Sequence, residues 1–142
     1  MTPTRRIILG VLTVLGTGVG AWAAALPRAF YDAFPGPFFG AWVGADGPFN
    51  EHLIRDVGAL YLALAAVSLY GAVSRSTAAG RSAGIAWIVF SIPHLLYHLG
   101  HLQALSPFDA VAEPIALALT VVLPIPLLIP SISQATEQEE QS

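Results

Sequence analysis

Residues Ile7–Leu26 read IILGVLTVLGTGVGAWAAAL, a run of 20 residues without a charged side chain. Three more uncharged runs follow it, at Val57–Val73, Gly84–Leu105 and Pro114–Pro130. A bilayer core needs about 20 helical residues, within a range of roughly 17–25, and all four runs qualify. Backbone groups in lipid must bond within their own segment, and no run alternates as a barrel strand would, so we predict four membrane-spanning helices.

The composition agrees with one lipid-embedded domain. Apolar residues make up 55% and charged residues 11% of the 142 residues, against about 25% charged in ordinary globular domains. The chain has no cysteine, which excludes disulfides and thiolate ligands, and no basic patch that would indicate nucleic acid. The lipid bilayer is the expected partner, and a homo-oligomer or a membrane partner subunit is a further candidate.

The predicted fold class is all-α, an integral membrane four-helix bundle with an aromatic and proline-rich outer loop. The predicted spans within the domain 1–130 are about 7–26, 54–74, 84–105 and 112–130. The remaining residues, 131–142, are polar and acidic, and we expect them to form a disordered cytoplasmic tail.

Arginine placement predicts the orientation in the membrane. The side with both termini carries Arg5, Arg6, Arg75 and Arg81, and the other side carries Arg28 and Arg55. The side richer in arginine is usually cytoplasmic, so we expect a multi-pass membrane protein with both termini in the cytoplasm. A cleaved signal peptide is the alternative for the first span. Against it, the Gly16-x-x-x-Gly20 motif is typical of a helix-packing face.

The connection between the first two spans is rich in aromatic residues and proline. It holds seven of the 14 aromatic residues of the chain and four of its 11 prolines. Proline interrupts helices, so we expect a short helix at about 28–34 followed by a compact outer loop. The aromatic residues fit an anchoring belt at the membrane surface. A lid over an outward-facing pocket is the alternative.

Three histidines in the third span form the main candidate site. His94, His98 and His101 are spaced by four and three residues, which places them on one stripe of a helix. Imidazole is the commonest metal ligand in proteins, so a metal ion or a haem is a candidate cofactor. Pro93 removes the helical hydrogen bond to the carbonyl of Val89, which is expected to bend the helix.

A second polar group opens the second span. The candidate metal or cofactor ligands are His94, His98, His101 and His52, and the supporting polar residues are Glu51, Arg55, Asp56, Tyr97 and Glu113. Ionisable residues inside a membrane usually face the bundle interior and indicate function. Residues 51–56 and the histidine stripe lie at equal depth in antiparallel spans. We therefore expect Asp56 or His52 to contact His98 or His101, and Arg55 to hold Glu51 or Glu113.

Three sequence patterns on the predicted outer side of the protein resemble those of a group of small bacterial membrane proteins, common among actinobacteria. These patterns are PRxFYxxFP at 27–35, DGPFNEHLxRDxG at 46–58 and PHLxYHxxHL at 93–102. The group shares a four-helix layout with the DoxX-like superfamily, so the resemblance implies the same fold. DoxX relatives are associated with quinone-linked sulfur oxidation, so a quinone-like ligand for this chain is implied only by analogy.

The sequence leaves three interpretations of function open and names no reaction. The outer polar cluster binds a metal, a haem or a quinone-like molecule, or it only fixes helix packing in a structural or accessory subunit. The third interpretation is a pathway for protons or a small molecule.

Overall fold

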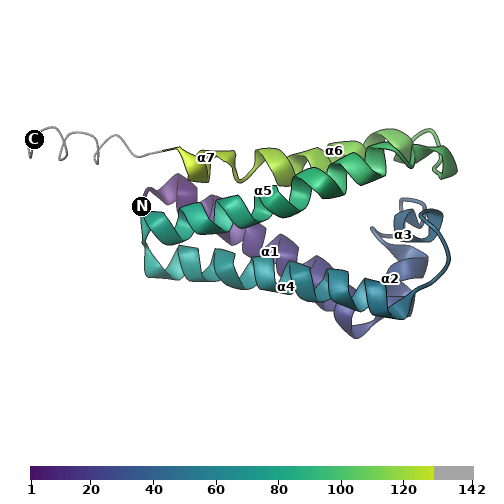
Figure 1. The fold of residues 1–142 in the computed structure, drawn as a ribbon, viewed down its shortest axis with the longest axis horizontal. Coiled ribbons are helices and arrows are strands. Elements are labelled where there is room, and N and C mark those ends of the chain that lie inside the picture. Colours follow the sequence, from purple (N-terminus) through teal and green to yellow (C-terminus); the bar gives the residue numbers. More distant parts are fainter. Residues whose placement is uncertain (130–142) are drawn as a thin grey trace, which may run out of the picture.

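The computed structural model describes residues 1–129, which form helices and contain no strand (Figure 1). The long helices are α1 (Pro3–Ala25), α4 (Glu51–Ser74), α5 (Thr77–Leu99) and α6 (Asp109–Val122), and α7 (Ile125–Leu128) follows α6. The short helices are α2 (Pro27–Ala33), α3 (Trp42–Ala45) and the 3₁₀ helix η1 (Leu102–Ala104). Four segments, α1, α4, α5 and α6 with α7, are long and apolar enough to cross a membrane. The predicted all-α class is confirmed.

The bounds of α5 differ most from the prediction. The helix ends at Leu99, whereas the sequence placed the third span at 84–105. After Leu99 the chain turns through i→i+3 bonds, with the N–H of His101 donating to His98 O at 2.9 Å. Such bonds tighten and end a helix, and they take His101 out of it. The predicted tail at 131–142 lies outside the described residues.

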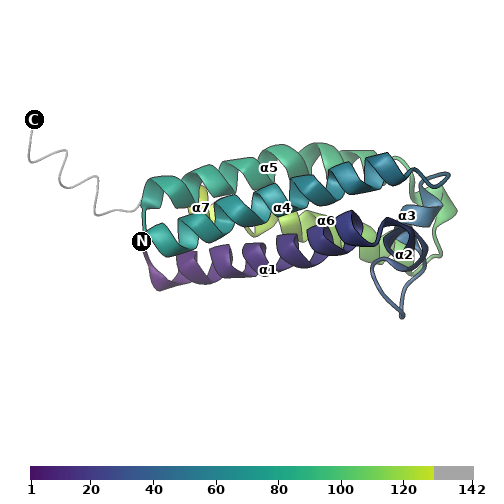
Figure 2. The ribbon, with the colours of Figure 1, turned by 90° about the horizontal axis from the view of Figure 1, so that it is seen from below.

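The four long segments run side by side and diverge at one end. Figure 1 shows α4 and α5 close together near the turn that joins them and farther apart at the opposite end. We call this opposite end, which holds α2, α3 and η1, the loop end. The N-terminus and α7 lie at the other end, which we call the terminal end (Figure 2). The divergence decides which polar residues can meet at the loop end.

Glycines bring α1 and α4 into close contact. A Cβ atom on Gly16 would lie 2.9 Å from Tyr61 O, and one on Gly20 would lie 2.8 Å from Gly58 O. A side chain at either position would therefore push the two helices apart. Close approach of small residues is a common way for helices to associate in lipid. The predicted packing role of the Gly16-x-x-x-Gly20 motif is confirmed, and α4 is its partner.

The core of the bundle lies where α1, α4 and α5 meet. Leu9 and Leu12 of α1 and Trp87 of α5 are fully buried there. The Nε1–H of Trp87 donates to Ser68 Oγ at 2.9 Å, and Ser68 Oγ donates to the Leu64 carbonyl at 2.8 Å. The first span thus supplies core residues to the bundle.

A buried arginine joins α1 to the end of α7. The guanidinium of Arg5 donates to Pro126 O at 3.2 Å and also contacts Ile129 O. Carbonyl groups at a helix C-terminus lack helical partners and carry partial negative charge, so a cation is favourable there. Arg5 therefore fixes the first and fourth membrane segments to each other at the terminal end.

The connection between α1 and α4 folds over the loop end as a packed aromatic unit. The predicted short helix at 28–34 is present as α2. Within it, Phe30 is buried and packs on Phe34 with their ring centroids 4.5 Å apart. The hydroxyl of Tyr31 donates to Gly47 O at 2.7 Å and ties α2 to the segment before α4. This arrangement places the segment around α3 against α5 and α6.

Candidate functional site

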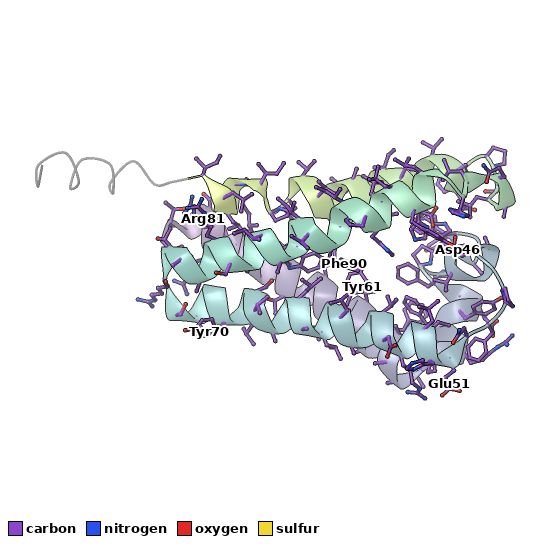
Figure 3. All side chains as sticks on the ribbon, in the orientation of Figure 1. Asp46, Glu51, Tyr61, Tyr70, Arg81 and Phe90 are labelled. Atoms are coloured by element: carbon purple, nitrogen blue, oxygen red, sulfur yellow. The ribbon has the colours of Figure 1, made fainter. Side chains whose placement is uncertain are left out.

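His98 is the meeting point of three separate segments at the loop end. Its Nδ1 lies 3.1 Å from Glu113 Oε1 of α6 and 3.7 Å from Asp46 Oδ2, which follows α3. The side chain of Glu113 is only 4% exposed and that of His98 only 11% exposed. Among residues 1–129, Nδ1 has no well-aligned hydrogen bond, so the contact to Glu113 is one of close approach. Figure 3 shows Asp46 beside the ends of α5 and α6.

Asp46 is the member of this cluster that lies outside the membrane-spanning segments. Burial raises the pKa of the Asp46 carboxyl above its usual value, and the nearby His98 and His101 oppose part of that rise. A raised pKa means that the folded protein holds this proton more tightly than the unfolded chain does.

Asp109 holds the aromatic connection to α6. Its carboxylate accepts from Trp42 Nε1 at 2.9 Å, from the backbone N–H of Gly40 at 3.2 Å and from Ser106 Oγ at 2.6 Å. Asp109 is buried, and these donors come from both loops at the loop end. A buried carboxylate with three donors is well satisfied, so its role in this arrangement is structural.

His94 lies deeper than His98 and joins the cluster to the seam between α4 and α5. Its ring stacks on Phe90 at a centroid distance of 5.0 Å and meets the His98 ring edge-on at 4.7 Å. Tyr61 of α4 approaches His94 at 6.5 Å and Phe90 at 5.0 Å. Figure 3 shows Tyr61 and Phe90 between the two helices. Aromatic rings therefore connect the polar cluster to the middle of the bundle.

His94 is also the polar end of an open groove. The groove has a volume of about 660 Å³ and lies between α4, from Leu60 to Val67, and α5, from Ala86 to His94. Its other lining residues are aliphatic or aromatic, apart from Pro93. A larger groove of about 810 Å³ follows α1 from Ile7 to Trp22, and the side chain in its lining that has a polar atom is Trp22, which can only donate. The α4–α5 groove differs because its polar group is an imidazole, which can both donate and accept.

His101 does not belong to the helical stripe that the sequence predicted. It follows the end of α5, its ring stacks on Tyr97 at 4.1 Å, and its Nδ1 lies 2.7 Å from Tyr97 O. The ring is exposed, and the side chain of Tyr97 is half-exposed. The early end of α5 at Leu99 thus reduces the stripe to His94 and His98.

The predicted contact between the start of the second span and the histidines is wrong. His52 Nε2 lies 3.4 Å from Asp56 Oδ2, and their side chains are 89% and 62% exposed. Both residues lie on the far side of α4 from Tyr61, which packs on Phe90 of α5. The divergence of the two helices enlarges the separation (Figure 1). The carboxylates that meet His98 come instead from Asp46 and Glu113.

Arg55 takes the first of the two partners expected for it. Its Nε donates to Glu51 Oε1 at 2.9 Å, and its guanidinium also contacts the Ala24 carbonyl at the end of α1. Figure 3 shows Glu51 far from Asp46, at the other side of the loop end. The alternative pairing with Glu113 is not found, since Glu113 contacts His98.

The candidate metal ligands do not come together. Among the described residues, no three histidine or acidic side chains are placed so that they could hold a metal ion. The reason lies in the helix geometry, because His101 leaves the stripe and His52 lies on an exposed face of α4.

Sequence reasoning missed Asp46, Asp109 and Trp42. Asp109 precedes Glu113 by four residues, and this spacing predicts that the two carboxylates lie on the same face of a helix. Asp46 and Trp42 lie in the proline-rich connection, where no helical periodicity predicts which way a side chain points. Comparison with protein families, curated proteins and solved structures finds no match to this chain. The function is therefore inferred from the geometry of the residues around His94 and His98.

Proposed function

We propose that this is an integral membrane protein that binds a lipid-soluble small molecule with one polar end. The apolar part of the molecule lies in the α4–α5 groove, and its polar end meets His94. Four helices that are long and apolar enough to cross a membrane support contact with a lipid bilayer. A quinone-like molecule is one member of this ligand class.

One observation carries the proposal, namely that an otherwise apolar groove ends at an imidazole. Ligand sites are mostly apolar, with a few polar groups that fix orientation. Because the groove opens to the side of the bundle, a ligand can enter it from lipid without crossing water. Behind His94, the ring of His98 lies at 4.7 Å and Glu113 lies 3.1 Å beyond His98. The buried cluster supports the His94 ring from the side away from the groove.

A metal ion or a haem receives less support. The described residues offer no group of three metal ligands. His94 and His98 pack against each other edge-on, rather than around a shared space.

We also propose that the protein is a multi-pass protein of the bacterial cytoplasmic membrane, with both termini in the cytoplasm and the loop end outside. The arginine distribution supports this orientation. With that orientation the ligand site opens in the outer half of the bilayer. Relationship to DoxX-like proteins stays a prediction from the three sequence patterns.

Photolabelling of the full chain in lipid nanodiscs tests the ligand site. The probe is dodecan-1-ol with a diazirine in the middle of its chain, and mass spectrometry locates the label. We expect label to concentrate on residues of the α4–α5 groove. Ala86→Phe, which fills the groove, should remove most of that label. The matched control is Val14→Phe, which places the same ring in the groove of α1 and should leave α4–α5 labelling unchanged.

A uniform distribution of label over lipid-facing side chains such as Val14, Leu119 and Val122 would contradict the proposal. Retention of groove labelling in Ala86→Phe would do the same, because a filled groove cannot hold the probe.

A structural role is the second candidate, and Asp109 favours it. Its hydrogen bonds from Trp42 Nε1 and from the Gly40 N–H attach the aromatic connection to α6. An accessory subunit whose polar residues only fix packing would keep this attachment and show no preference for the groove in the labelling experiment. A homo-oligomer or a partner subunit is compatible with either function.

A further inference from the structure

A proline in the wall of the α4–α5 groove leaves a backbone carbonyl without its helical partner. Pro93 lies inside α5, where its ring nitrogen carries no hydrogen to donate to Val89 O. Val89, Pro93 and His94 all line the groove. The carbonyl that lacks the donor of position 93 therefore lies on the side of α5 that contains the polar end of the groove.

Nothing else in the described chain satisfies this carbonyl from a side chain. Among residues 1–129, no side-chain donor hydrogen-bonds to Val89 O, and no hydrogen bond uses a ring nitrogen of His94. The side chain of Val89 is 68% exposed, so this face of α5 meets lipid in a membrane. Lipid offers no hydrogen-bond donor, which makes an unpaired backbone group costly there.

The carbonyl that lacks its donor at position 93 and the His94 ring together define a chemical preference. A neutral imidazole carries one N–H donor and one acceptor nitrogen, and a carbonyl accepts only. A hydroxyl group combines one O–H donor with acceptor lone pairs. One hydroxyl can therefore donate to Val89 O and accept from the His94 ring at the same time. A ketone or an ether can accept from His94 but leaves Val89 O unpaired.

We propose that the molecule in the groove is a lipid-soluble alcohol or phenol, whose hydroxyl donates to Val89 O and accepts from His94. This inference rests on the proposed ligand site and adds its chemical class. It favours a long-chain alcohol or a hydroquinone over a quinone, an ether or a charged amphiphile. Pro93 is then a specificity-determining residue, because it frees the carbonyl that selects the hydroxyl.

Two photoprobes with the same chain test the inference. One is the diazirine-bearing dodecan-1-ol, and the other is its methyl ether, which lacks the O–H. In wild-type protein in nanodiscs, we expect the alcohol to label the groove roughly three- to tenfold more than the ether, as one net hydrogen bond predicts. Pro93→Ala restores an N–H to Val89 O, so the ratio should fall to about one while both probes still label the groove.

The matched control is Pro114→Ala, which removes another proline from inside a helix, in α6 and away from the groove. It should keep the wild-type ratio. Equal groove labelling by alcohol and ether in wild type would overturn the hydroxyl preference while leaving the ligand site intact. An unchanged ratio in folded Pro93→Ala would overturn the role of Val89 O. Absence of groove labelling by either probe would overturn the ligand site itself. The wild-type ratio needs no variant, so the inference can fail even if Pro93→Ala does not fold.

Discussion

The Nδ1 of His98 lies 3.1 Å from the Oε1 of Glu113, and this contact joins α5 to α6 within the buried part of the bundle. Asp46 adds a third segment at 3.7 Å from the same nitrogen. Buried polar groups in a membrane gain stability from one another because lipid offers no alternative partner. His98 is thus both a packing residue of the loop end and the support behind His94.

Glu113→Gln should weaken the bundle, because it replaces the buried carboxyl group that lies against His98 Nδ1. We expect a loss of about 1–3 kcal/mol in the free energy of unfolding, measured by denaturant titration in mild detergent. His98→Gln should cost a similar amount, and the double variant should cost less than the sum, because both changes remove the same contact. Glu51→Gln breaks an exposed pair with Arg55 and should change stability by less than about 1 kcal/mol. Strictly additive losses would show that His98 and Glu113 do not interact.

Trp42→Phe should loosen the aromatic connection without unfolding the bundle. The variant keeps a ring but loses the donor to Asp109 Oδ1, a bond worth about 1 kcal/mol. Amide hydrogen exchange should accelerate at Gly40 and its neighbours and remain slow in α1 and α4. Trp22→Phe is the control, since no hydrogen bond of the Trp22 ring nitrogen ties it to α6. Unchanged exchange at Gly40 would show that the Gly40–Asp109 contact does not depend on Trp42.

Gly20→Ala should destabilise the α1–α4 pair. The added Cβ would lie 2.8 Å from Gly58 O and 2.9 Å from Leu62 N, so the helices must move apart. Gly18→Ala is the control on the same helix, because nothing lies within 4 Å of its added Cβ. Alanine favours helix over glycine by roughly 0.5–1 kcal/mol, so Gly18→Ala should be neutral or stabilising. Equal thermal stability of the two variants would contradict the close packing.

The four spans follow from uncharged runs of sufficient length, and the α1–α4 contact follows from the Gly16-x-x-x-Gly20 spacing. The site depended on two facts that periodicity does not encode. One is the end of α5 at Leu99, which removes His101 from the stripe.

The other is the path of the connection around α3. Depth along antiparallel helices suggested residues 52 and 56 as partners of the histidines, but both are exposed. Glu113, the alternative partner expected for Arg55, lies beside His98 instead. Depth gives a position along the helix axis and no direction around it. Asp46 lies in an irregular segment, so only the fold could place it beside His98.

Asp46→Asn should change how stability depends on pH. Burial raises the pKa of Asp46, so between its ordinary and its raised pKa the folded state binds a proton that the unfolded chain releases. Stability of the wild type should therefore fall as pH rises through that window. The asparagine stays neutral, so the melting temperature of Asp46→Asn should rise relative to wild type with increasing pH, followed between about pH 3 and pH 7. A difference that does not vary with pH would contradict the raised pKa.

A paired-cysteine experiment tests the placement of the aromatic connection. The chain has no native cysteine, so the background is clean. Asp46→Cys with His98→Cys should crosslink through a short bifunctional reagent in nanodiscs, because the two wild-type side chains approach to 3.7 Å. The control pair is Asp56→Cys with His98→Cys, which should not react because residue 56 lies on an exposed face of α4.

The two pairs share the cysteine at position 98, so a difference in yield reports the partner position alone. Replacing His98 removes its imidazole, but the Asp109 carboxylate still holds Trp42 and the Gly40 N–H and keeps residue 46 near α5. If the control pair crosslinks and the cysteines at 46 and 98 do not, the start of α4 faces the histidines and the aromatic connection lies elsewhere. The support that His98 gives to His94 from the loop end would then be lost, and the ligand site would need a different polar end.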